Sequence, residues 1–311
     1  MMQYPDGIHA IDTEYVRPKL DASHLIVEDG RAAFVDTGTN YSVPLLLDAL
    51  ASTGLDVGDV DYVILTHIHL DHAGGAGRLM QELPNARCAV HPRGARHIAN
   101  PEKLIAGTEA VYGVEMTRRM YGEIQPIDED RLLVPDDGQV IELNGRPLRI
   151  FYTLGHAKHH YCIHDARSNG VFTGDSFGIS YREFDTGEGA FIYPTTTPIH
   201  FDPPEAHKAI DRIMGFGPEQ VFLTHYSRVD DLDRLAADLH TVIDGFVAIA
   251  KQHANDSQRT ESIKSATFDY LAARLDRHGF AGGRDAMYEI LEPDLVLNTQ
   301  GLEFWLDHAE H

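Results

Sequence analysis

The stretch THIHLDHAGG, residues 66–75, decides both the expected fold and the expected site. It follows directly on DYVILT at residues 61–66, a nearly continuous apolar run. Such a run is typical of a strand buried on both faces, as in a parallel sheet with helices on each side. Because α/β folds place their chemistry at the carboxyl ends of these strands, we expect residues 66–75 to lie at a functional site.

Four side chains in this stretch are good metal ligands: His67, His69, Asp71 and His72. Imidazole nitrogens and carboxylate oxygens suit Zn²⁺, Fe or Mn²⁺. In an extended segment His67 and His69 point to one side, and Asp71 and His72 then turn toward a second point. A surface loop that happens to be rich in histidine is the alternative interpretation, and this density of donors at a strand end disfavours it.

Three later predicted strands also end in a residue that binds metals. His156 ends PLRIFYTLGH, Asp175 ends GVFTGD and His225 ends QVFLTH. One such ending would carry little weight, but three are difficult to arrange by chance. We therefore predict that these side chains join the histidine-rich stretch.

The charge of the chain limits its partners. The 311 residues include 26 Lys and Arg against 48 Asp and Glu, which gives a net charge of −22. An acidic surface repels phosphate backbones and anionic membranes, so nucleic acid and membrane partners are not expected. We expect a small-molecule substrate instead.

Composition predicts a folded cytoplasmic protein. The hydrophobic fraction of 43% is enough for a packed core. No apolar run approaches the roughly 20 residues of a membrane span, and no signal peptide is visible. Cys88 and Cys162 stand in strand-like contexts, so we expect buried thiols rather than a disulfide.

The chain divides into two parts by pattern. Up to about residue 230, strands alternate with helices such as residues 42–53 and 204–217, and residues 94–130 are irregular to helical. Residues 231–311 carry apolar side chains near the helical period and no convincing strand. We predict a catalytic domain at 1–230 and a C-terminal helical extension at 231–311. Its apolar stripe predicts packing on the core, with a homodimer interface or a lid over the site as alternatives.

Five segments together resemble the metallo-β-lactamase-fold hydrolase superfamily. They are VDTG with Asp36, THIHLDHAGG, TLGHAKHH, FTGD and LTH, in the family's order over about residues 8–227. The glyoxalase II-like and lactonase-like members are the most similar group. The resemblance implies an α/β fold, a four-layer αββα sandwich, here with a C-terminal helical extension.

The resemblance also implies a dinuclear site with two divalent ions, whether Zn, Fe or Mn. His67, His69 and His156 would bind the first ion. Asp71, His72 and His225 would bind the second ion, and Asp175 would bridge the two. Asp36 would orient the histidine loop through hydrogen bonds, although a plain turn aspartate before Gly38 is the alternative.

The implied reaction is hydrolysis of a small ester, thioester or lactone by a metal-bridged hydroxide. Asp71 is a candidate to pass a proton to the leaving group. Tyr193, in FIYPTTTP, is a candidate donor to a developing oxyanion, with simple loop packing as the alternative. His159 or His160 is expected near the site or exposed, and His24 is expected to pack rather than to bind metal.

Other activities on the same fold remain open. A phosphodiesterase is one, and a persulfide dioxygenase-like oxidoreductase, which needs one iron, is another. The second ligand set disfavours the oxidoreductase, and the lack of any match to the glutathione-binding tail of glyoxalase II disfavours a glutathione thioester. A sensor with a vestigial site is the non-enzymatic alternative, which a complete set of ligands disfavours.

Overall fold

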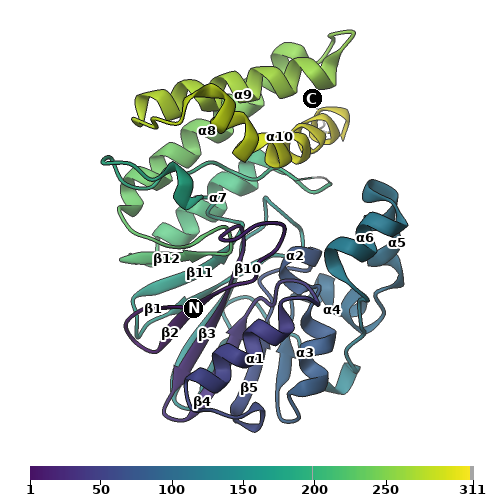
Figure 1. Cartoon of the computed structure of the whole chain (residues 1–311), viewed down its shortest axis with the longest axis vertical. Coiled ribbons are helices and arrows are strands. Elements are labelled where there is room, and N and C mark those ends of the chain that lie inside the picture. Colours follow the sequence, from purple (N-terminus) through teal and green to yellow (C-terminus); the bar gives the residue numbers. More distant parts are fainter. Residues whose placement is uncertain (198, 309–311) are drawn as a thin grey trace.

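Two mixed β-sheets lie face to face in the centre of the protein, with helices on their outer faces (Figure 1). This computed structural model describes residues 1–197 and 199–308. The first sheet contains, in spatial order, β1 (Met2–Gln3), β2 (Ile8–Asp12), β3 (Ala22–Glu28), β4 (Arg31–Val35), β5 (Val60–Ile64), β6 (Arg87–Ala89) and β7 (Leu132–Leu133). Strands β4 to β7 are parallel to one another, and β1 to β4 pair antiparallel.

The second sheet is mostly antiparallel. In spatial order it contains β13 (Ser227–Val229), β12 (Gln220–Leu223), β11 (Gly170–Gly174), β10 (Tyr161–Asp165), β9 (Arg146–Tyr152) and β8 (Val140–Leu143). Only the pair β11 and β12 is parallel among the ladders of this sheet in the described residues. The parallel pair matters for the site because β11 and β12 end side by side, at Asp175 and His225.

The two sheets bury their facing sides against each other. Ile26, Val35 and Ile64 of the first sheet belong to one apolar cluster with Ile163 and Phe172 of the second. Ile64 therefore points into the space between the sheets, whereas its neighbour Val63 belongs to a different cluster on the helix side. The prediction that this strand is buried on both faces is correct, but its second face meets another sheet rather than helices.

Helices cover both outer faces. Those before β8 are α1 (Val43–Ser52), α2 (Leu70–Ala73), α3 (Ala76–Glu82), α4 (Pro92–Ala99), α5 (Glu102–Tyr112) and α6 (Val114–Tyr121). Helices α1 and α3 pack their apolar residues on the first sheet. Helix α7 (Pro203–Met214) packs Ile210 and Ile213 on the second sheet. The arrangement confirms the predicted four-layer αββα sandwich.

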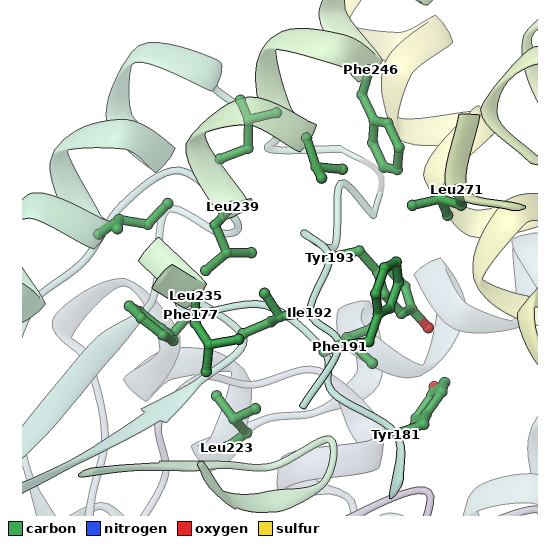
Figure 2. Close-up of a cluster of buried hydrophobic side chains, with 14 of the residues drawn as sticks. Phe177, Tyr181, Phe191, Ile192, Tyr193, Leu223, Leu235, Leu239, Phe246 and Leu271 are labelled. Carbon is green, nitrogen blue, oxygen red and sulfur yellow. The ribbon is translucent and has the colours of Figure 1, made fainter. Parts of the chain in front are cut away.

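Three long helices follow the sandwich and lie beyond α7 (Figure 1). They are α8 (Leu232–His253), α9 (Arg259–Arg277) and α10 (Gly283–His308). Leu235, Leu239 and Phe246 of α8 and Leu271 of α9 share one apolar cluster with Leu223 of β12 (Figure 2). The predicted helical extension is therefore present, and its apolar side chains pack on the second sheet.

Helix α1 matches the range predicted for it, and short strand β13 and the early start of α10, at Gly283, were not predicted. Cys88 and Cys162 are both free thiols in the interior. Within residues 1–197 and 199–308, no helix is long and apolar enough to cross a membrane. The domain boundary at residue 230 stays a prediction.

Candidate metal centre

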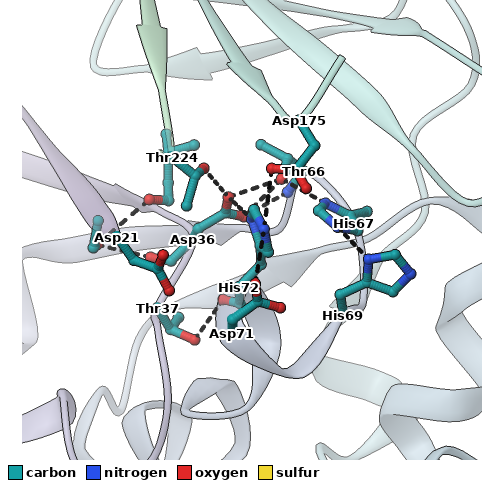
Figure 3. Close-up of polar contacts among 12 residues, drawn as sticks. Asp21, Asp36, Thr37, Thr66, His67, His69, Asp71, His72, Asp175 and Thr224 are labelled. Carbon is teal, nitrogen blue, oxygen red and sulfur yellow. Dashed lines mark hydrogen bonds and ion pairs between the residues drawn. The ribbon is translucent and has the colours of Figure 1, made fainter. Parts of the chain in front are cut away.

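Loops next to four strands, β5, β10, β11 and β12, converge at one edge of the sandwich (Figure 3). The loop after β5 brings His67, His69, Asp71 and His72, the last two on the single turn of α2. The other predicted ligands come from the segment before β10, from the end of β11 and from the end of β12. Parallel strands end at the same edge, which explains why residues so distant in sequence meet here. All seven predicted ligands are brought together.

Three imidazoles form the first triad, which consists of His67, His69 and His156. The Nδ1 atom of His69 lies 2.9 Å from Nε2 of His67 and 3.1 Å from Nε2 of His156. His156 Nδ1 faces the backbone carbonyl of Thr195 at 3.4 Å, so a proton on Nδ1 leaves a lone pair on Nε2. Three nitrogens so close together are what a divalent cation requires.

The second triad consists of Asp71, His72 and His225. The carboxylate of Asp71 lies 3.7 Å from Nε2 of His72 and 3.7 Å from Nε2 of His225. Here too the opposite ring nitrogens are occupied. Nδ1 of His72 lies 2.9 Å from Asp36, and Nδ1 of His225 lies 2.6 Å from Asp21.

Asp175 stands between the triads and offers one oxygen to each. Its Oδ2 atom is 3.3 Å from Nε2 of His156 in the first triad. Its Oδ1 atom is 3.2 Å from Nε2 of His72 and 3.5 Å from Nε2 of His225 in the second triad. This is the geometry of a bridging carboxylate.

Buried atoms without partners show that these residues fit a metal. Nε2 of His72 and Oδ1 of Asp175 are both buried and make no hydrogen bond. A buried polar atom left unpaired costs about 1–3 kcal/mol, so it normally has a partner in the functional state. Both atoms face the space between the triads, where a divalent cation would satisfy them. The site can therefore hold a metal.

Asp36 ties three of the converging loops together (Figure 3). Its carboxylate accepts hydrogen bonds from the backbone N–H and the hydroxyl of Thr66, from the hydroxyl of Thr224 and from Nδ1 of His72. The residue follows β4 with a positive φ of 55°, which turns the chain sharply at the edge of the sheet. The contacts are those expected of a residue that orients a histidine ligand.

Asp21 was not predicted from the sequence. This fully buried residue precedes β3 and faces Nδ1 of His225, as Asp36 faces His72. It stands in PKLDASHL, a context without a metal-site motif, and its partner lies at the other end of the sandwich domain in sequence. Only the tertiary pairing of the loops identifies it.

The histidines of the first triad have lowered pKa values. Burial is the main cause for His67, His69 and His156, and neighbouring histidines lower the pKa of each further. These imidazoles are therefore neutral at pH 7. A neutral imidazole is the form that binds metal.

The histidines of the second triad behave in the opposite way. Burial opposes their charge, but carboxylates outweigh it. Asp175 and Asp71 raise the pKa of His72 well above its usual value. Asp21 and Asp175 raise the pKa of His225 to about 10. Without metal, the second triad thus carries protons that a cation must displace.

Other predicted histidines surround the centre. His160 is fully buried, and its Nε2 accepts the backbone N–H of Asp175, so it holds the backbone of Asp175 in place. The ring of His159 lies 5.4 Å from that of His69. His24 packs edge-on against Phe172 and Phe222 between the sheets, as expected of a core residue.

Tyr193 does not present a free hydroxyl. It is fully buried, and its hydroxyl donates to a carboxylate oxygen of Asp294 on α10, at 2.8 Å. Its assignment as an oxyanion donor stays a prediction. Two other tyrosines, Tyr15 and Tyr121, meet with their hydroxyls 3.0 Å apart. Burial and the charge of Asp71 raise the pKa of both, so both are neutral donors.

Two of the seven predicted ligands are partly exposed to solvent, His69 in the first triad and Asp71 in the second. The side chain of Asp71 is 25% exposed, whereas those of His72 and Asp175 are at most 5% exposed. Behind His156 and Asp175 lies a small cavity of about 20 Å³, lined mainly by apolar residues of α7 and α8 such as Ala209 and Leu239. Solvent therefore reaches the centre beside His69 and Asp71 rather than through this cavity.

Comparison with known proteins points to one family. The family model of the metallo-beta-lactamase superfamily matches residues 18–225. The solved structure of the archaeal metallo-beta-lactamase superfamily protein ST1585 from Sulfolobus tokodaii superposes with a TM-score of 0.63 at 22% identity, over 96% of this chain and 99% of that one. By sequence, the metallo-beta-lactamase fold-containing protein ST1585 of Sulfurisphaera tokodaii is 26% identical over 200 residues, 62% of this chain and 68% of that protein.

Two relatives have names that state an activity. The atrochrysone carboxyl ACP thioesterase of Aspergillus fumigatus is 28% identical over 117 residues, 38% of this chain and 27% of that protein. The hydroxyacylglutathione hydrolase of Stenotrophomonas maltophilia is 31% identical over 152 residues, 49% of this chain and 44% of that protein. The chain thus spans less than half the length of these two relatives.

Proposed function

The chain belongs to the metallo-beta-lactamase superfamily, and from that premise we propose that it is a dinuclear metal-dependent hydrolase of a small ester, thioester or lactone. The observation that carries the proposal is the position of Asp175. One of its oxygens faces His156 of the first triad and the other faces His72 and His225 of the second. A carboxylate so placed is suited to hold two ions side by side.

The chemistry divides between the ions and the chain. When bound, divalent ions supply Lewis acidity, which polarises an acyl oxygen and lowers the pKa of water. The chain supplies orientation, because Asp36 and Asp21 fix the ring positions of His72 and His225. Asp71 is the partly exposed carboxylate of the second triad, so we assign it the role of passing a proton to the leaving group. No serine or cysteine nucleophile is required.

The substrate class follows from charge and from neutral donors. The net charge of −22 repels polyanions over long range. The hydroxyls of Tyr15 and Tyr121, whose pKa values burial and the charge of Asp71 raise, are neutral groups able to hydrogen-bond an uncharged acyl compound. The names of the thioesterase and hydroxyacylglutathione hydrolase relatives support acyl transfer to water as the reaction.

The test is metal analysis of the purified protein together with a substrate panel. The panel holds lactones, thioesters, simple esters, phosphodiesters and a β-lactam, assayed before and after metal removal with a chelator. We expect about two ions per chain, and acyl-ester turnover that chelation abolishes and added metal restores. One iron per chain with O₂ consumption would contradict the proposal, and turnover of phosphodiesters alone would replace the substrate class.

A further inference from the structure

One face of helix α10 lies against a loop in the connection between β11 and α7. Asp294, Asn298 and Gly301 are spaced by four and three residues, so they share one side of the helix. Each of the three contacts the segment Tyr193–Thr197, which we call the clamped loop. The clamped loop belongs to the sandwich domain, whereas α10 is the last element of the C-terminal extension.

Asn298 makes the central contacts. Its side-chain oxygen accepts the backbone N–H of Thr196 at 2.7 Å, and its backbone carbonyl accepts the hydroxyl of Thr196 at 3.0 Å. Its amide nitrogen faces the carbonyl of Pro194 at 3.5 Å. Asn298 and Thr196 are both almost fully buried, so water cannot replace these bonds.

Gly301 allows the helix to come this close. A Cβ atom at this position would stand 1.4 Å from the carbonyl oxygen of Thr196, which no side chain tolerates. Glycine here is required by the close approach of two backbones rather than by an unusual φ. Any larger residue must push the clamped loop away from α10.

Tyr193 anchors the beginning of the clamped loop. It lies among apolar side chains from α8 and α9 (Figure 2), and its hydroxyl bonds Asp294. The loop is therefore held at Tyr193, Pro194 and Thr196 by three successive residues of one helix face.

Between these anchors lies the residue that contacts the metal centre. The backbone carbonyl of Thr195 faces Nδ1 of His156 at 3.4 Å. That carbonyl selects the tautomer with its proton on Nδ1, and so leaves the lone pair of Nε2 directed at His67 and His69. The position of Thr195 is set by its neighbours on both sides, and they are held by α10.

We propose that the Asp294–Asn298–Gly301 face of α10 is a positioning device for the first triad, acting through Thr195 on His156. The proposal rests on the proposed function, in that His156 is taken as a ligand of the first ion. It gives the C-terminal extension a role in metal binding, although none of the extension's described residues is among the seven candidate ligands. Asn298 and Gly301 are positioning residues in this account.

The test measures metal affinity rather than turnover. Metal-free protein is titrated with Zn²⁺ in competition with a chromophoric chelator, and the two dissociation constants are determined for each variant. In Asn298→Ala we expect one of the two dissociation constants to rise by about tenfold. This is the lower end of the range of effects for losing a residue that orients a metal ligand. Gly301→Ala should change the same constant in the same direction, because it displaces the same loop by steric contact.

Two further variants separate positioning from general loosening. Met287→Ala truncates a buried residue of α10 about 16 Å along the helix from Asn298. It should lower the melting temperature and leave both constants unchanged. In the His69→Ala background, which should lack the first ion, adding Asn298→Ala should not raise the dissociation constant of the remaining ion.

The outcomes distinguish the two proposals. If His69→Ala removes no ion from the protein, the dinuclear assignment fails. If His69→Ala removes one ion but Asn298→Ala and Gly301→Ala bind both ions like the parent, the positioning proposal is overturned by itself. The positioning proposal would also be overturned if Met287→Ala raised the same dissociation constant as much as Asn298→Ala does, with the two variants at similar melting temperatures.

Discussion

Two clusters of buried charged and titratable residues lie at opposite ends of strands β3 and β10. Asp21 precedes β3 at the metal centre, and Glu28 ends the same strand at the other edge. There Arg146 forms a paired contact with Asp165 and reaches Glu28, which also binds Arg167. We call this second group the closed cluster, because none of its side-chain atoms is among the buried atoms without a partner.

The metal centre differs in composition and in completeness. The closed cluster combines opposite charges, so its members satisfy one another. The metal centre gathers lone pairs and carboxylates, and it leaves Nε2 of His72 and Oδ1 of Asp175 without partners. Both clusters are buried and both perturb pKa values. Between these two clusters, therefore, the buried atoms left without partners distinguish the metal centre, whereas burial and perturbed pKa values do not.

The largest expected effect is at the metal centre. His69→Ala removes a nitrogen of the first triad, so one ion should be lost and hydrolysis should fall by on the order of a thousandfold. The free energy of unfolding of the metal-free form should change by no more than about 1 kcal/mol, because the His69 side chain is only partly buried. Elemental analysis and chemical denaturation measure both quantities. Full metal content in this variant would refute the ligand assignment.

The complementary change is in the closed cluster. Arg146→Met leaves Asp165 and Glu28 without their buried partner, which should destabilise the fold by about 3–5 kcal/mol. Metal content of the folded protein should stay at the parent value. Urea denaturation of the metal-free form gives the first quantity. A variant of normal stability that had lost metal would reverse the roles assigned to the two ends.

Acid should distinguish the triads. In the metal-free protein the raised pKa values of His72 and His225 mean that both carry protons at neutral pH. Affinity at the second triad should thus rise with pH, by about tenfold per unit for each displaced proton, up to about pH 10. The first triad, with lowered pKa values, should show no such slope above pH 6.5.

Titration calorimetry in buffers of different ionisation enthalpy measures how many protons the protein releases when each ion binds. Equal proton release from both triads would contradict the contrast between them. The contribution of the closed cluster to stability should not change over this pH range. Burial favours a raised pKa for Asp165, but hydrogen bonds from Arg146 outweigh it and hold the pKa below its usual value of 3.8. Its contribution to stability is present above that pH and is lost as the pH falls through the lowered pKa.

The smallest expected effect concerns Asp36. Asp36→Asn keeps an oxygen that accepts Nδ1–H of His72 but removes the negative charge, so affinity at the second triad should fall by about tenfold. The first triad should be unaffected. Thr224→Val, which removes another hydrogen bond to Asp36 while leaving its charge, is the matched control. Equal loss in the two variants would show that hydrogen bonding rather than charge determines the effect.

The sequence predicted the ligands because they stand in a dense local motif or at the ends of predicted strands. His67, His69, Asp71 and His72 are neighbours in the chain, and His156, Asp175 and His225 end apolar runs. The four-layer order of the fold came from the resemblance of these segments to a known family. Periodicity alone could not distinguish a second sheet from helices on the inner face of β5.

The residues that orient the ligands could not be predicted from the sequence. Asp21, Thr195 and Asn298 act on ligands far away in the chain, and their local sequences are those of ordinary loops and helices. The closed cluster was also missed, because Arg146 and Asp165 stand among alternating strand residues that suit a solvated surface. Such pairings depend on the tertiary arrangement of loops, for which a single sequence carries no local signal.

Anomalous diffraction from crystals of the metal-loaded protein tests the central claim most directly. We predict two peaks about 3.5–4 Å apart. One should lie within bonding distance of His67, His69 and His156, the other within bonding distance of Asp71, His72 and His225, and Asp175 should contact both. A single peak, or a pair of peaks that Asp175 does not bridge, would contradict the account.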